Sequence, residues 1–71
     1  MKNKVIIFGN KDFAELAHYY LTHDSEYEVV AFTANERYIT DSSFRGLPIV
    51  PFEQLEKWYS PMEYFLFTPI S

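Results

Sequence analysis

The chain has 71 residues and a net charge of −4, and its 6 basic side chains are scattered rather than clustered. It contains no cysteine, which excludes disulfides and thiolate metal sites. It has neither the basic clusters that bind nucleic-acid phosphates nor the roughly 20 consecutive apolar residues of a membrane span. No secretion signal opens it. We therefore expect a single small cytoplasmic domain over residues 1–71, with no nucleic-acid or membrane partner.

The first 21 residues predict a strand, a tight turn and a helix. Val5–Phe8 is apolar at every position, which is typical of a parallel strand covered on both faces. Gly9–Asp12 forms the turn, and Asp12, with Glu15 three residues later, suits the cap of the helix. Helical spacing then predicts one apolar stripe that lies on the sheet, made of Phe13, Leu16, Ala17, Tyr20 and Leu21.

The middle of the chain continues the alternation of strands and helices. Residues 28–33 indicate a second strand, and residues 34–45 form a polar connection whose length favours contact with another molecule. Residues 46–50 predict a short extended piece that Pro48 keeps at a sheet edge. Pro51 suits the first turn of a second helix. The apolar face of that helix consists of Phe52, Leu55 and Tyr59.

The last residues predict a third main strand at 64–68, again apolar without alternation. Residues 69–71 stand where the next strand-to-helix turn is expected, with Ser71 suited to an N-cap. We therefore expect the chain to be a fragment or one module of a longer protein. The expected fold class is α/β, a three-layer domain with a parallel sheet of three main strands and flanking helices.

The candidate binding site lies at the ends of these strands. Open parallel sheets bind ligands in the crevice beyond the carboxyl ends of their strands. The turn after the first strand and the end of the second therefore supply the candidate binding residues, with residues 68–71 closing the crevice. These candidates are Gly9, Asn10, Lys11, Thr33 and Asn35. Asn35 both donates and accepts hydrogen bonds, which suits a base or a sugar hydroxyl.

The same residues are poorly suited to a dinucleotide. Asp12 places a carboxylate in the field at the helix N-terminus that a pyrophosphate would use, and Lys11 offsets only one negative charge. No acidic side chain follows the second strand directly to hold a ribose hydroxyl. Each residue also has a simpler interpretation: Gly9 serves the tight turn, Asp12 caps the helix, and Lys11 is a solvated loop side chain.

The chain resembles a family through several segments in order. They are Val5–Gly9, Phe13–His18, Tyr27–Phe32, Gly46–Val50 and the strand that ends at Thr68. In order and spacing they resemble the amino-terminal domain of bacterial sugar acyltransferases, the family of the sialic acid O-acetyltransferases and the bacillosamine-pathway N-acetyltransferase. The Gly46-Leu47-Pro48-Ile49-Val50 segment is the most discriminating part of the resemblance.

The resemblance implies a small Rossmann-like domain that holds a sugar or nucleotide-sugar precursor of a bacterial surface glycan. In that family a left-handed β-helix of hexapeptide repeats follows, forms a trimer, binds acetyl-coenzyme A and carries the catalytic histidine. Those parts lie outside these 71 residues. We therefore expect no catalytic residue, cofactor or metal site in this chain and no catalytic role for His18 or His23. A homo-oligomer stays open, and the resemblance implies a trimer formed through the missing domain.

Two alternatives stay open, because the chain departs from the family at the expected site. Relatives tend to have a Gly-x-Gly-Gly-like turn and an Asp pair, where this chain has Gly9–Asp12 and Thr33–Asn35. One alternative is an NAD-binding piece of an oxidoreductase, which the missing glycines and missing acid oppose. The other is an assembly domain that binds no ligand and uses exposed aromatic side chains against the rest of the protein or a sister subunit.

Overall fold

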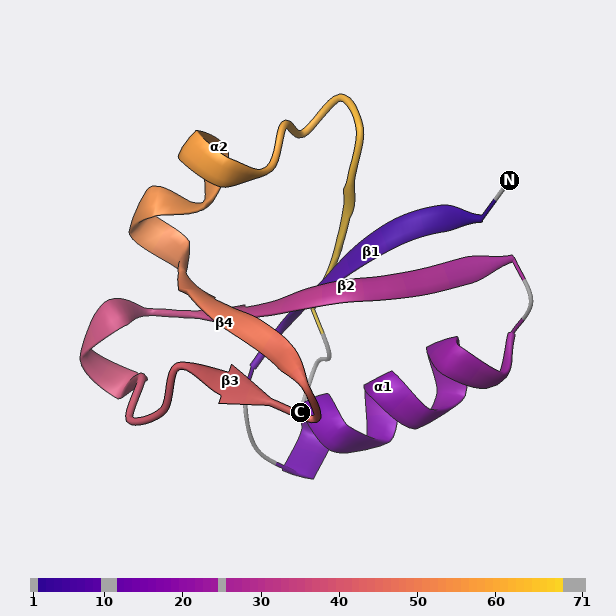
Figure 1. Cartoon of the computed structure of the whole chain (residues 1–71), viewed down its shortest axis with the longest axis horizontal. Helices are drawn as coiled ribbons and strands as arrows, with labels where there is room; N and C mark the ends of the chain where they lie inside the picture. The colour runs from indigo at the N-terminus through magenta and orange to yellow at the C-terminus, as the bar shows by residue number, and fades with distance from the viewer. Residues whose placement is uncertain (1, 10–11, 25, 69–71) are drawn as a thin grey trace.

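A computed structural model of the chain describes residues 2–9, 12–24 and 26–68 as an α/β fold with one five-stranded sheet (Figure 1). The strands are β1 (Asn3–Phe8), β2 (Tyr27–Ala34), β3 (Ser43–Phe44), β4 (Leu47–Pro51) and β5 (Phe65–Phe67). The helices are α1 (Asp12–His23), α2 (Leu55–Trp58) and the 3-10 helices η1 (Glu36–Tyr38) and η2 (Phe52–Gln54). The α/β class expected from the sequence is confirmed.

The sheet has the order β3-β4-β2-β1-β5, which is not the order of the strands in the sequence. β1 pairs in parallel with both β2 and β5, and β2 pairs in parallel with β4. β3 alone runs antiparallel, against β4. The sheet thus has more strands than the three main ones that the sequence predicts, and β2 lies at its centre.

The segment around Pro48 was expected at a sheet edge, and this expectation is wrong. β4 has a partner on each side, but the two partners use different residues of it. β2 pairs with Ile49–Pro51, whereas the short β3 pairs with Leu47 and Pro48. Pro48, which has no N–H to donate, therefore stands outside the stretch that pairs with β2, and Pro51 stands at the last pair of that ladder.

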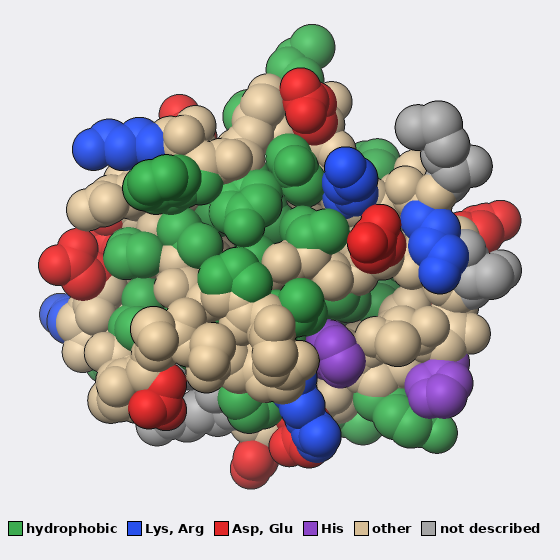
Figure 2. Space-filling view, in the orientation of Figure 1, with side chains coloured by type: hydrophobic (Ala, Val, Ile, Leu, Met, Phe, Trp, Pro, Cys, Tyr) green, Lys and Arg blue, Asp and Glu red, His purple; other side chains and the backbone are tan. Residues whose placement is uncertain are grey.

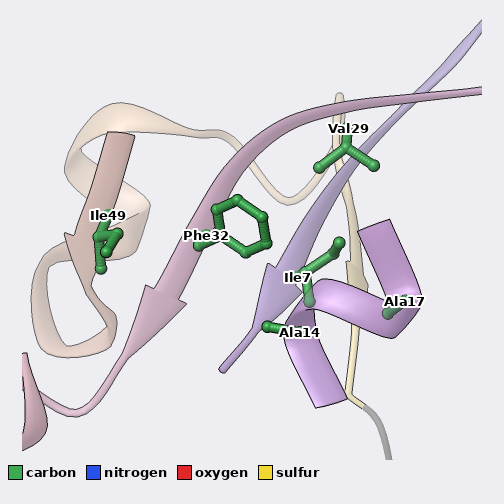
Figure 3. Packing of buried hydrophobic residues seen from close by; sticks show 6 residues of the cluster. All are labelled: Ile7, Ala14, Ala17, Val29, Phe32 and Ile49. Carbon is green, nitrogen blue, oxygen red and sulfur yellow. The ribbon is translucent and has the colours of Figure 1, made fainter. Parts of the chain in front are cut away.

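The two faces of the sheet carry different elements (Figure 1). α1 packs on the face to which Ile7 and Phe32 point, and the segment of η2 and α2 lies on the other face, over Ile6. The core cluster lies between α1 and the sheet, as Figure 3 shows. It consists of Ile7, Ala14, Ala17, Val29, Phe32 and Ile49. On the opposite face, Ile6, Ala31 and Thr33 are also buried, although the covering segment there is short.

The buried face of α1 differs from the predicted stripe. Ala14 and Ala17 are the buried residues of α1, whereas Phe13, Leu16 and Tyr20 are 56%, 51% and 66% exposed. The small alanine side chains let the helix backbone lie close to Ile7, as Figure 3 shows, and close packing in a core favours such a fit. The larger side chains are turned to the flank of the helix, where the structure describes no element that covers them.

Two other predicted elements are less regular than expected. The second helix is split into η2 and the single turn of α2. The third predicted strand is present as β5, but its three residues are all exposed instead of covered on both faces. Asp12 is the first residue of α1 rather than a residue before it.

The surface mixes charges of both signs. In the view of Figure 2, acidic and basic side chains are dispersed around an apolar centre, and neither sign dominates this face. Within the described ranges, no helix combines the length and apolar character that a membrane crossing requires.

Phe32 offers a direct test of the core. Its side chain is fully buried and packs against the rings of His18 and Phe44, at 5.8 and 5.1 Å between ring centroids. We expect Phe32→Ala to lower the free energy of unfolding by about 3–5 kcal/mol, as large-to-small core substitutions do. Phe13→Ala, the same change at an exposed position, should cost about 1 kcal/mol or less. Urea unfolding measures both, and equal losses would contradict this description of the core.

Candidate functional site

The carboxyl ends of β1, β2 and β4 meet at one edge of the sheet, because the three strands are adjacent and parallel. Gly9 follows β1 there, and its N–H donates a hydrogen bond to the carbonyl oxygen of Thr33 at 2.6 Å. Gly9 has a φ of +127°, a conformation that side chains rarely adopt. An added Cβ would meet the Cβ of Ala14 at an ordinary 3.6 Å. The backbone conformation, not a lack of space, therefore requires glycine.

Thr33 has a structural role at this edge. It is fully buried, and its Oγ1 donates a hydrogen bond of 2.6 Å to the carbonyl oxygen of Val50. This bond ties β2 to β4 next to their paired residues, where Thr33 stands opposite Val50. A buried hydroxyl needs such a partner, and this one has it. The side chain of Thr33 thus presents no polar group at the surface of the site.

Asn35 and Glu53 form the polar part of the site. Asn35 is half-buried at the end of β2, and its Nδ2 donates to Oε2 of Glu53 at 3.4 Å. The backbone N–H of Glu36 donates to the other carboxylate oxygen, Oε1, at 3.0 Å. Glu53 thereby holds the first turn of η1, while Asn35 keeps its side-chain oxygen to accept a further hydrogen bond. Two segments that are 18 residues apart in the chain are joined in this way.

Glu53 is held in its ionised form. Hydrogen bonds from the backbone N–H groups of Glu53 itself and of Glu36 lower the pKa of the Glu53 carboxyl below its ordinary value of 4.5. The side-chain amide of Asn35 and the positive charge of Arg37 act in the same direction, and burial opposes them. A carboxylate has about four positions for accepted hydrogen bonds, so Glu53 retains acceptor capacity beyond the bonds from its own N–H, from Glu36 and from Asn35.

A cleft of about 650 Å³ adjoins this polar pair on the face of the sheet opposite α1. Ile6 and Leu66 form its apolar floor, and η2 and α2 contribute one wall. Its lining residues include Phe52, Glu53, Tyr59 and Tyr64. Small-molecule sites have similar volumes and combine apolar walls with a few polar groups. The cleft therefore gives the Asn35–Glu53 pair an adjacent apolar surface.

Aromatic contacts hold the walls of the cleft in place. The ring of Phe52, in η2, packs edge-on against Phe8, the last residue of β1, at 5.2 Å between centroids. Tyr59 and Tyr64 make a second edge-on pair at 5.0 Å, across the loop between α2 and β5. Such pairs contribute about 0.5–1.5 kcal/mol beyond the area that they bury. η2 is thus fixed against the end of β1, which keeps Glu53 near Asn35.

The predicted site residues divide into three groups. Gly9 and Asn35 lie at the carboxyl edge, at the ends of the adjacent strands β1 and β2, as the sequence indicates. Thr33 lies there too, but inside the sheet. Asn10 and Lys11 fall outside the described residues.

The sequence did not indicate Glu53, which looks like a solvated residue of a helix face. Its place depends on the pairing of β4 with β2, in which Ala34 stands opposite Pro51, so that the residues after both strands emerge together. If the parallel pairing of the Gly46–Val50 segment with the second strand had been known, the Glu53 carboxylate would have been expected beside Asn35. Patterns among neighbouring residues in the sequence do not reveal which distant strands pair.

His18 and His23 do not form a site together. The ring of His18 lies against Phe32, and that of His23 lies against Tyr19 at 4.3 Å between centroids. Figure 2 shows the two histidine side chains apart on the same face of the molecule. Within the described part of the chain, no group of three His, Cys, Asp or Glu side chains is placed to hold a metal ion.

Comparisons with known protein families, curated proteins and solved structures give no match for this chain.

The ionised state of Glu53 predicts a pH dependence of stability. Because its pKa is lower in the folded than in the unfolded chain, its contribution is present above 4.5 and is lost as the pH falls through the lower, folded value. We expect Glu53→Gln to lower the urea midpoint at about pH 7, by an amount that shrinks steadily as the pH falls below 4.5. Glu56→Gln, an exposed control in α2, should leave the midpoint unchanged throughout this range. A loss that does not depend on pH would contradict the assigned role.

Proposed function

We propose that this chain is the substrate-binding module of a sugar acetyltransferase and that it holds a nucleotide-sugar or sugar at the carboxyl edge of a Rossmann-like sheet. The observation that carries the proposal is the meeting of Gly9, Asn35 and Glu53 at this edge, beside a cleft. The substrate class comes from the resemblance of the sequence to the amino-terminal domains of bacterial sugar acyltransferases.

The strand order supports a Rossmann-like interpretation. From β1 the chain moves outward through β2 to β4 and then returns to place β5 on the other side of β1. This reversal makes a topological switch point at the end of β1, where open α/β sheets bind their ligands. Gly9 follows β1 at that position. The turn that the sequence singles out thus coincides with the position that the topology favours.

The chemistry of the edge favours hydroxyl groups over phosphates. Asn35 offers a free amide oxygen, and the ionised Glu53 accepts further hydrogen bonds, so both suit the hydroxyls of a ribose or a pyranose. Acidic side chains stand nearby, with Glu36 at η1 and Asp12 in the first turn of α1. Negative charge at a helix N-terminus opposes a bound anion. We infer that the sugar, not the diphosphate, contributes most of the recognition.

The acetyl transfer itself belongs to another part of such an enzyme. The resemblance assigns acetyl-coenzyme A and the catalytic histidine to a following β-helix domain. His18 and His23 lie on α1, whereas the cleft lies on the opposite face of the sheet. The role of this chain is therefore to bind and orient the substrate, and the chain alone should transfer no acetyl group.

A titration followed by backbone amide shifts tests this function. We expect a uridine diphosphate sugar, and more weakly the free sugar, to shift the amides of Gly9, Asn35, Glu36 and Glu53 with a saturable curve. Asn35→Ala removes one hydrogen-bonding group and should weaken binding about three- to tenfold. Asn3→Ala, the same change at the opposite end of β1, is the matched control and should leave the affinity unchanged.

Three other results of this titration would contradict or change the proposed function. Absence of shifts at these amides up to millimolar ligand contradicts the proposed function. Tighter binding of NADH than of any nucleotide-sugar favours the oxidoreductase alternative. Equal weakening by the Asn35 and Asn3 substitutions places the binding elsewhere.

A further inference from the structure

A continuous apolar strip runs along β5 and the adjacent flank of α1. On the α1 side it consists of Phe13, Leu16, Tyr20, Phe65 and Phe67, and Leu66, opposite Ile6, adds an apolar side chain on the other face of β5. These side chains are 42 to 66% exposed. A groove of about 340 Å³ joins the two elements and is lined almost wholly by apolar side chains, among them Phe13, Tyr20 and Phe67. Monomeric proteins rarely expose a contiguous apolar patch larger than a few hundred Å². Apolar patches above that size usually mark interaction sites.

The strip ends at the unpaired side of a strand. Among the described residues, β5 pairs with β1 and with no other strand. Its outer backbone N–H and C=O groups are thus free to pair with another strand, and proteins usually protect such edges with charges, proline or a covering element. Residues 65–67 carry none of these protections.

The side chains of β5 suit pairing with a second copy of β5. Phe65-Leu66-Phe67 reads the same in both directions, so two antiparallel copies related by a two-fold axis at Leu66 would place each Phe65 opposite the other Phe67. In register with Val5 and Ile7 of β1, both phenylalanines point to the α1 face. Cross-strand aromatic pairs contribute about 0.2–1 kcal/mol each. A two-fold interface requires such self-complementarity.

The same pairing brings the two α1 flanks together. A two-fold axis perpendicular to the sheet keeps both α1 helices on one face, with the Phe13, Leu16 and Tyr20 side chains of each copy turned toward the other. The strip carries no charged side chain, and Glu15 of α1 is paired with Arg45 away from it. The repulsion between two copies of net charge −4 therefore acts only from outside the contact, where salt screens it.

The area of the strip is close to what a stable pair needs. From their exposed fractions, and since a large aromatic side chain offers about 150–250 Å², the six side chains present on the order of 600 Å². A standard interface buries about 800 Å² per partner, and the backbone edge of β5 supplies part of the difference. The strip is thus large enough for a reversible dimer.

We propose that two copies of this chain associate through antiparallel pairing of β5, which joins their sheets into one and packs the two α1 flanks together. The polar residues Gly9, Asn35 and Glu53 take no part in this contact, whereas Phe65 and Leu66 of β5 also line the cleft beside them.

Sedimentation equilibrium of the 71-residue chain tests the association. Between about 10 μM and 1 mM protein, we expect the average mass to rise from that of one chain toward that of two. Leu66→Lys and Tyr20→Lys should each weaken association about tenfold or more, because each places an unpaired charge in the apolar contact. Met62→Lys adds the same charge at a side chain that is 92% exposed outside the strip, and it should have no effect.

The pairing itself is tested in a mixture of labelled and unlabelled chains. We expect nuclear Overhauser effects between Phe65 of one copy and Phe67 of the other. A monomer at every concentration, a mass that grows beyond two chains, or a Met62→Lys effect equal to that of Leu66→Lys would each overturn the proposal. If circular dichroism shows that the Leu66→Lys chain is unfolded, the Tyr20→Lys chain tests the proposal instead. The side chain of Tyr20 is 66% exposed, so we expect its replacement to leave the fold intact.

Discussion

The parallel pairing of β2 with a neighbour on each side is the interaction on which the rest of the structure depends. Ala31, Phe32 and Thr33 are completely buried between β1 and β4, and Phe32 lies at the centre of the packing against α1. A domain of this size buries only about 60% of the surface of its unfolded chain, so it has little apolar burial to spare. Of the ten buried apolar residues in the described part of the chain, four lie on this strand, more than on any other element.

The candidate site follows from that pairing rather than from any single motif. Because β1, β2 and β4 are parallel and adjacent, the residues after them emerge at the same edge, and the Asn35–Glu53 contact bridges segments that the sequence separates. Phe52 against Phe8 and Thr33 against Val50 fix the two sides of this edge. A polar pair beside an apolar cleft results, and it gives the acetyltransferase proposal a definite place to hold a sugar. The polar pair lies away from the exposed strand β5, but Phe65 and Leu66 of that strand line the same cleft.

Local patterns predicted what depends on neighbours in the chain. The continuous apolar run of β1, the turn at Gly9 and the start of α1 all follow from composition and spacing over a few residues. The buried face of α1 was predicted only in part: Ala17 and Leu21 of the predicted stripe do pack on the core. Ala14 was missed and Phe13 and Tyr20 are exposed, because close contact with the sheet favours the small side chain while hydrophobicity alone favours the aromatic ones. The role of Glu53 depends on a strand pairing between distant segments. Such pairings are set by the whole sheet.

The arrangement of β4, β2, β1 and β5 is the central claim, and backbone nuclear Overhauser effects measure it most directly. The structure predicts interstrand effects in parallel registers, with Phe32 beside Ile49, Ile7 beside Phe32 and Ile6 beside Leu66. It also predicts effects from the side-chain amide protons of Asn35 to the side chain of Glu53. An antiparallel pattern between β2 and β4, or β5 next to any strand other than β1 within a single chain, would contradict the account.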